Sequence, residues 1–158
     1  HMISILRVDE RLLHGQVATA WTHTLQIDAI ILANNEVEKD ELRKRLIRIA
    51  KPSSVKLAIL NLKNAAALIA KHSRSNFKVM VLVGSIEDAK YLVENSEGIK
   101  EVNLGHISFK EGKKALSQTV FVDEGEIEDL KYIASKGVQI DARQLPSEKV
   151  KNVFDQLK

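Results

Sequence analysis

Residues 3–25, ISILRVDERLLHGQVATAWTHTL, predict the first strand, loop and helix of the chain. The apolar run at 3–6 opens a buried strand that we extend to residue 8, and the helix follows from the spacing of Val17, Ala18, Trp21 and Leu25. Between them, residues 7–16 contain two arginines, two acids, one histidine and one glycine. Ligands of open α/β sheets bind beyond the carboxyl ends of the strands, so this loop is the first candidate site.

The side chains of this loop suit phosphoryl transfer. A neutral imidazole nitrogen is a nucleophile near pH 7, which makes His14 the candidate nucleophile of the loop. Arg7 and Arg11 offer guanidinium groups, whose fork geometry grips phosphoryl oxygens in a way that lysine cannot. Asp9 is expected to accept a hydrogen bond from the second ring nitrogen of His14 and so to fix its tautomer.

Backbone groups near the loop are expected to complete a phosphate cradle. The start of a helix offers unpaired N–H groups and a positive dipole end, here at Gly15 and Gln16, and Gly15 has no Cβ to hold a phosphoryl group away. Gly84 and Ser85 follow the apolar strand predicted at 77–83. In a parallel sheet they lie at the same edge as the loop, so both are candidate phosphate-binding residues.

Plain structural explanations exist for the same residues. A histidine after a strand is commonly a surface or capping residue, and arginines beside an acid usually form solvated ion pairs worth little energy. Two other functions fit the same loop: a non-catalytic regulatory module that binds a phosphorylated ligand or protein, and a small hydrolase with His14 as base. The hydrolase has the least support, because no serine or pair of carboxylates is placed to activate water.

Strands and helices alternate along the rest of the chain, which predicts a single domain over residues 1–158. We expect a three-layer α/β fold with a mostly parallel sheet of about seven strands and helices on both faces. One strand is expected to be antiparallel, because the strands at 102–104 and 119–123 are too close in sequence for a helical crossover. The other strands are predicted at 27–33, 55–60, 77–83 and 138–142, and the helices at 35–50, 61–71, 85–95, 123–136 and 145–157.

The helix predicted at 35–50 has one apolar and one basic face. Asn35 is expected to cap it, with Glu38 in capping-box position. The apolar face is expected to point inward, and it contains Leu42, Leu46, Ile47, Ile49 and Ala50. We interpret the basic residues between Arg43 and Arg48 as a solvated surface, with docking of a partner as the alternative.

Composition argues against several classes of function. Net charge is only +3, and no basic run is interleaved with the 4 Phe, 2 Tyr and 1 Trp, so we predict no nucleic-acid binding. The absence of cysteine excludes disulfides and thiolate metal sites, and we expect no metal or other cofactor. No apolar run approaches the roughly 20 residues of a membrane helix. No signal peptide is visible, so we expect a cytoplasmic protein, with His1 as a cloning remnant before a native start at Met2.

Residues 7–21, RVDERLLHGQVATAW, resemble the active-site segment of enzyme IIB components of the mannose/fructose/sorbose family of the sugar phosphotransferase system (PTS). The pattern of that family is Arg, hydrophobic, Asp, acid, Arg, Leu, hydrophobic, His, Gly, Gln, Val, often followed by Trp. Residues 33–37 (ANNEV) and 103–113 (NLGHISFKEGK) are also similar, and the resemblance covers nearly the whole chain. His106 is a departure, because many relatives have a small or apolar residue there.

The resemblance implies a phosphotransferase that acts on a protein-Nπ-phosphohistidine and a sugar. His14 would accept a phosphoryl group from enzyme IIA and transfer it to a sugar brought in by the membrane components IIC and IID. Arg11 and Arg7 would stabilise the charge of the transferred group. His106 is a candidate for contact with the phosphate or a partner, and not for a second phosphorylation site. The sugar, the surface that docks IIA and the oligomeric state, including a homo-oligomer, are left open.

Overall fold

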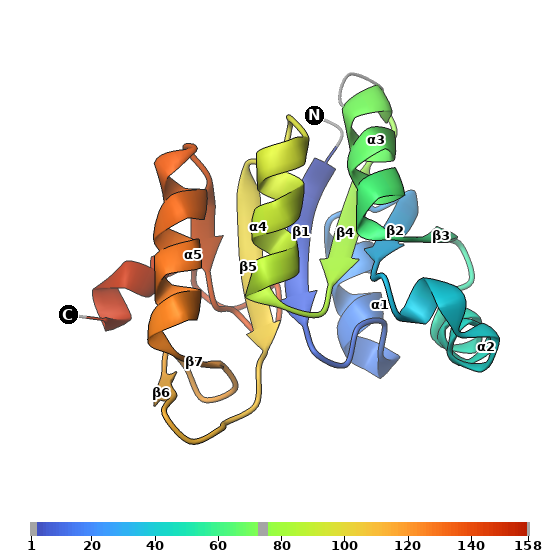
Figure 1. Cartoon of the computed structure of the whole chain (residues 1–158). Coiled ribbons are helices and arrows are strands. Elements are labelled where there is room, and N and C mark those ends of the chain that lie inside the picture. The colour runs from blue at the N-terminus through green and yellow to red at the C-terminus, as the bar shows by residue number, and fades with distance from the viewer. Residues whose placement is uncertain (1–2, 73–75, 158) are drawn as a thin grey trace.

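Six parallel strands form the central sheet, in the order β3-β2-β4-β1-β5-β8 (Figure 1). The computed structural model describes residues 3–72 and 76–157, so the interpretation of His1 and Met2 falls outside the described residues. The strands of the sheet are β1 (Ile3–Asp9), β2 (Ala29–Ala33), β3 (Lys56–Leu60), β4 (Val79–Val83), β5 (Glu101–His106) and β8 (Gln139–Asp141). The helices are α1 (Gly15–Thr24), α2 (Glu41–Ala50), α3 (Leu62–His72), α4 (Ile86–Asn95) and α5 (Glu124–Ser135), with short 3-10 helices η1 (Val37–Lys39) and η2 (Val153–Gln156).

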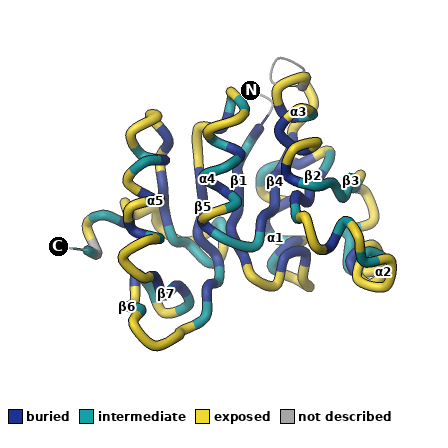
Figure 2. The backbone as a smooth tube through the Cα atoms, in the orientation of Figure 1, coloured by how far each residue is buried: buried dark blue, intermediate teal, exposed yellow. Residues whose placement is uncertain are grey.

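Helices cover both faces of the sheet. α3, α4 and α5 pack on one face, where Ile69, Leu92 and Leu130 lie in the larger of two buried apolar clusters. α1 covers the other face, where Trp21 packs with Ile5 in the second cluster. All five residues of β4 are buried, as expected of a central strand covered on both sides (Figure 2). The three-layer α/β class predicted from the sequence is confirmed.

The strand order places a topological switch point at the carboxyl end of β1. β1 lies between β4 and β5, and all three run parallel. The helices that follow β1 and β4 cover opposite faces of the sheet, α1 on one and α4 on the other (Figure 1). Neighbouring strands whose connections diverge in this way mark the topological switch point where α/β folds bind ligands.

The predicted reversal of direction lies outside the central sheet. β6 (Lys114–Ala115) and β7 (Phe121–Val122) pair with each other as a separate antiparallel ribbon. Ile107 and Val120 form a single parallel bridge next to it. The reversal is therefore confirmed, but the expectation of an antiparallel strand within a sheet of about seven is wrong. The ribbon projects beyond the carboxyl end of β5 (Figure 1).

The helix expected at 35–50 is shorter, and its apolar face is not covered. α2 begins at Glu41 and is capped by Asp40, which accepts a hydrogen bond from the Arg43 N–H at 3.0 Å. Asn35 instead accepts from the Leu62 N–H at 2.8 Å, at the start of α3. Only Ile47 of the expected inward residues is buried, because α2 lies at the carboxyl edge of the sheet and not over its face (Figures 1 and 2).

Other predicted helix ends are confirmed, with one exception. Ser85 caps α4 by accepting from the Asp88 N–H at 3.1 Å. Asp123 and Glu126 form a reciprocal capping box at the start of α5. The helix expected at 145–157 is reduced to η2, since residues 143–152 are irregular. Within 3–72 and 76–157, no helix combines the length and apolar character that crossing a membrane requires.

Candidate functional site

Two buried leucines hold the loop after β1 in place. Leu12 and Leu13 are 5% and 4% exposed, and both belong to the apolar cluster beneath α1. The Leu12 N–H donates to the Asp9 carbonyl at 2.9 Å, and Leu12 has a φ of 58°, which turns the chain sharply. The polar residues on either side are thereby pushed outward, so Arg11 and His14 face solvent.

His14 lies at the amino terminus of α1. It is the N-cap residue, with an extended φ of −152°, and its side chain is exposed and makes no hydrogen bond within the described part of the chain. Gly15 follows with a φ of 50°, a conformation that favours glycine, while a Cβ there would meet no atom within 4 Å. The imidazole therefore stands free beside the unpaired N–H groups of the first helical turn, including those at Gly15 and Gln16.

Asp9 holds Arg11 through hydrogen bonds. Its carboxylate is 1% exposed and accepts three hydrogen bonds from Arg11, from the backbone N at 2.9 Å, Nε at 3.1 Å and Nη2 at 3.2 Å. The Arg11 side chain is 32% exposed. The expected hydrogen bond from Asp9 to the imidazole is not among those of the described residues. Asp9 thus orients the guanidinium of Arg11. The N–H groups of Arg11 that do not donate to Asp9 point away from the Asp9 carboxylate.

Arg7 lies beneath the loop and not on its surface. Its side chain is 2% exposed and lies 3.4 Å from the Asp9 carboxylate, and it donates to Oδ1 of Asn103. Its guanidinium carbon is 5.3 Å from the ring centroid of Trp21. Burial lowers the pKa of Arg7, and the neighbouring Asp9 carboxylate opposes that effect. A group so enclosed supports Asp9, and the geometry gives it no access to a phosphoryl group.

A buried polar network extends from Arg7 to the edge of the sheet. Nδ2 of Asn103 donates to Oδ1 of Asp141 at 2.6 Å and to the Arg143 carbonyl at 2.8 Å. Arg143 Nε donates to Asp141 at 2.8 Å, and its guanidinium is also 5.3 Å from the Trp21 ring. Sequence reasoning missed Asn103, Asp141 and Arg143. A signal existed for Asn103, which is a polar residue inside the strand predicted at 102–104.

Gly105 completes this packing. A Cβ at Gly105 would lie 2.3 Å from the guanidinium carbon of Arg7, which is closer than real Cβ contacts. The close approach of β5 to the Arg7 side chain therefore requires glycine at this position.

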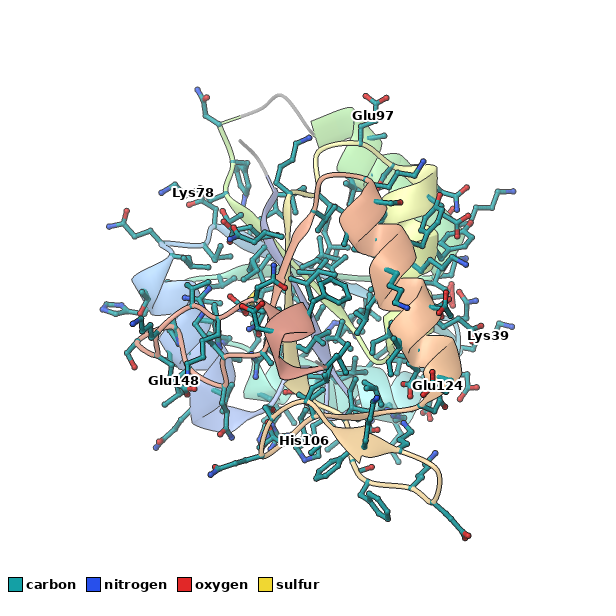
Figure 3. The ribbon with its side chains drawn as sticks, turned by 90° about the vertical axis from the view of Figure 1, so that its left-hand side faces the viewer. Lys39, Lys78, Glu97, His106, Glu124 and Glu148 are labelled. Carbon is teal, nitrogen blue, oxygen red and sulfur yellow. The ribbon has the colours of Figure 1, made fainter. Side chains whose placement is uncertain are left out.

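The end of β5 and the segment that follows it are tied to the loop after β1 by hydrogen bonds. The Glu10 N–H donates to the His106 carbonyl at 3.0 Å, and the Glu10 carboxylate accepts from Ser108 N and Oγ at 3.1 and 2.9 Å. His106 lies at the end of β5, opposite Asp9 in the register, at the same end of the molecule as the start of α5 (Figure 3). Its Nδ1 is buried without a hydrogen-bond partner among the described residues.

Gly84 and Ser85 lie differently with respect to the loop. A Cβ on Gly84 would be 3.5 Å from Asn34 Nδ2 and 3.6 Å from Leu12 Cδ2, so Gly84 packs against the underside of the loop. The Ser85 hydroxyl is occupied by its cap of α4. The structure thus brings Gly84 to the loop, and it gives Ser85 a structural task. In the described residues no three His, Asp or Glu side chains gather as a metal site would require.

The model of the PTS system sorbose subfamily IIB component matches residues 3–158. The chain belongs to this family of IIB components. The IIB chain is 33% identical over 142 residues to the sorbose-specific EIIB component of Lacticaseibacillus casei, covering 90% of this chain and 87% of that protein.

Longer relatives and a solved structure agree with this assignment. The IIB chain is 30% identical over 154 residues to the mannose-specific EIIAB component of Escherichia coli K12, covering 98% of this chain but only 48% of that protein. The crystal structure of the IIBSor domain of the Klebsiella pneumoniae sorbose permease superposes with a TM-score of 0.90 at 30% identity, covering 99% of this chain and 96% of that one. The IIB chain therefore spans about half the length of the mannose-specific relative.

The arrangement in the IIB chain can stabilise a phosphoryl group in two ways. The exposed guanidinium of Arg11 supplies a fixed positive charge, and the helix start at Gly15 supplies N–H donors. Both flank His14 along the loop. The buried carboxylate of Asp9 limits the rotation of Arg11, so that the cation does not reorganise when charge arrives.

Proposed function

We propose that the IIB chain carries a phosphoryl group on His14, received from enzyme IIA and delivered to a sugar held by the membrane components IIC and IID. The observation that supports this most directly is the exposed imidazole at a helix start, without a hydrogen bond in the described residues, on the loop that also carries Arg11. An imidazole with no partner is free to attack and to carry. The relay takes place on the cytoplasmic side of the membrane.

In the first step, a lone pair of the His14 imidazole attacks phosphorus as the N–P bond of the donor phosphohistidine breaks. The donor imidazole keeps the electron pair of that bond and takes a proton from water. In the second step, a sugar hydroxyl attacks phosphorus, the N–P bond to His14 breaks, and the hydroxyl proton passes to solvent. Over the two steps, two N–P bonds break while one N–P bond and one O–P bond form, without oxidation or reduction, and the scheme needs no metal or other cofactor.

Each nearby residue has a separate task in this proposal. Arg11 stabilises the charge spread over the phosphoryl oxygens, and the N–H groups at Gly15 and Gln16 bind the same oxygens. Asp9 positions Arg11 through three hydrogen bonds. Arg7 positions Asp9 from below, which replaces the direct phosphate contact expected from the sequence.

Intact-mass spectrometry tests the proposal. The chain is incubated with phosphoenolpyruvate, the general phosphotransferase proteins and its cognate IIA, beside the variants His14→Ala and His23→Ala. His23 is an exposed histidine at the other end of α1 and serves as the matched control. We expect one phosphoryl mass gain, lost in acid and kept in base, in the wild type and His23→Ala but not in His14→Ala. If phosphorylated IIA gave no mass gain on the wild type, the chain would be a regulatory relative and not a carrier.

A further inference from the structure

The aliphatic face of α2 is exposed to solvent. Leu42, Leu46 and Ile49 are 66%, 58% and 80% exposed. They are spaced by four and three residues, so they share one face of the helix, which we name the α2 ridge. Ile47 anchors α2 on the opposite side at 8% exposure. Three aliphatic side chains this exposed to solvent on one face of a helix are unusual. The proposed phosphotransfer step uses none of them.

Exposed arginines flank the α2 ridge. Arg43, Arg45 and Arg48 are exposed, and none of them forms an ion pair within residues 3–72 and 76–157. At 100° per residue, Arg43 lies on one side of the ridge and Arg45 and Arg48 lie on the other. An apolar centre with arginines around it is the composition of a protein-binding surface.

The ridge is continuous with the loop of His14. A hollow of about 210 Å³ is lined by Arg11, Leu12, Leu13, Arg43, Leu46 and Ile47. Leu46 belongs both to the ridge and to this hollow, and Leu13 immediately precedes His14. α2 and the loop also lie at the same end of the sheet in Figure 1. A protein seated on the ridge would therefore touch the loop that presents His14.

We propose that the α2 ridge docks the phosphorylated IIA donor; this rests on the proposed function. The donor has to bring its own phosphohistidine to His14, and Arg11 and Arg43 on the shared hollow attract that charge. A second copy of the chain is a poor occupant, because a twofold contact through the ridge would place the same three arginines against one another. The matching surface on IIA is an apolar patch with carboxylates at its rim.

The test variant is Leu42→Ser/Ile49→Ser. Neither residue lines the hollow, and both are more than half exposed, so the site and the fold stay intact; an unchanged thermal melting curve checks this. Phe77→Ser is the control, because Phe77 is 41% exposed and precedes the amino end of β4, at the opposite end of the sheet. Arg45→Glu, with Lys71→Glu as its control on α3, tests the charge of the rim.

The readout is the rate of phosphorylation as the concentration of phosphorylated cognate IIA is varied. We expect the KM for IIA to rise about tenfold or more in Leu42→Ser/Ile49→Ser, equivalent to about 1.4 kcal/mol, with kcat within about twofold. Arg45→Glu raises KM and weakens its salt dependence. Once phosphorylated at high IIA concentration, each variant transfers to sugar in membranes at the wild-type rate.

Three outcomes would overturn the docking proposal. If the KM of Leu42→Ser/Ile49→Ser for IIA is unchanged while the wild type is phosphorylated normally, IIA does not dock on the α2 ridge, and the proposed function still stands. A defect confined to transfer from the phosphorylated variant to sugar assigns the ridge to the membrane components. Failure of phosphorylated IIA to modify the wild type refutes the proposed function itself, and the docking proposal with it.

Discussion

Replacing Arg7 by methionine tests whether Arg7 supports Asp9 from below or binds the phosphoryl group directly. Methionine keeps an apolar stem of similar length, so the change removes the charge and the hydrogen bonds without opening a large cavity. The change leaves Oδ1 of Asn103 without its Arg7 donor, removes the 3.4 Å ion pair with Asp9 and removes a guanidinium from above Trp21.

The magnitude follows from these contacts. A buried acceptor left without its donor loses about 1–3 kcal/mol, and a desolvated cation–π contact about 2 kcal/mol. Asp9 keeps three hydrogen bonds from Arg11, so it is not stranded as a lone buried charge. We therefore expect Arg7→Met to lower the free energy of unfolding by about 3 kcal/mol, at the lower end of the range for a broken buried pair.

Urea unfolding and thermal melting measure this loss. For a domain of this size, about 3 kcal/mol corresponds to a fall in Tm of roughly 6–12 °C. Arg11→Met is the matched control, because Arg11 shares Asp9 but is 32% exposed, and its loss of stability should stay below about 1 kcal/mol. If Arg7→Met melted like the wild type while phosphotransfer fell a hundredfold, Arg7 would be a phosphate ligand and the supporting role would be wrong.

Three further predictions concern the neighbours of this network and one helix end. Gly105→Ala should destabilise the chain by about 1–3 kcal/mol, because its Cβ would meet the Arg7 guanidinium, and the loss should be smaller in an Arg7→Met background; denaturant unfolding of the double-mutant cycle measures both. Arg11→Ala should slow phosphorylation of His14 about 100- to 1000-fold in single-turnover kinetics, and a normal rate would remove Arg11 from the mechanism. Burial, together with the Glu87 carboxylate, raises the pKa of Asp88, so ionisation of Asp88 opposes folding. Asp88→Asn should therefore be more stable than the wild type at pH 7, and its advantage should disappear below the ordinary carboxyl pKa of 3.8, where Asp88 is neutral in both folded and unfolded states; melting curves across that range with no change in the difference would contradict this.

The strand, loop and helix at residues 3–25 could be predicted because local signals agree there. An apolar run, a glycine at the helix start and apolar residues at helical spacing all indicate the same boundaries, and β1 and α1 begin and end within about two residues of them. β4 was equally plain, since a strand covered on both faces is apolar throughout. The capping box of Asp123 and Glu126 also follows from local sequence alone.

The position of Arg7 could have been foreseen in part. Side chains alternate along a strand, so Arg7 and Asp9 share a face with Ile5, which is buried beneath α1. Which partners enclose Arg7 depends on Asn103, which is distant in sequence, and no local pattern reports that contact. Local sequence also does not report the hydrogen-bond partner of Asp9. Both Arg11 and His14 lie within five residues of it, and only the folded geometry decides that Asp9 accepts from Arg11.

The exposed face of α2 shows a limit of periodicity. The pattern of apolar residues tells which face of a helix is hydrophobic, but not whether the fold places anything over it. Leu42, Leu46 and Ile49 were expected in the core because most such faces are buried there. α2 lies at the carboxyl edge of the sheet and not over its face (Figure 1), so the apolar pattern was correct and the inward orientation inferred from it was wrong.

The central claim is that the phosphoryl group rests on His14. After phosphorylation through IIA, the chain is digested at neutral or basic pH, and its peptides are fragmented by electron transfer, which preserves the N–P bond. We predict that the added phosphoryl mass lies on His14 alone, in a peptide from the loop after β1. A phosphoryl group located on His106 or on any other histidine, with His14 unmodified, would contradict the account.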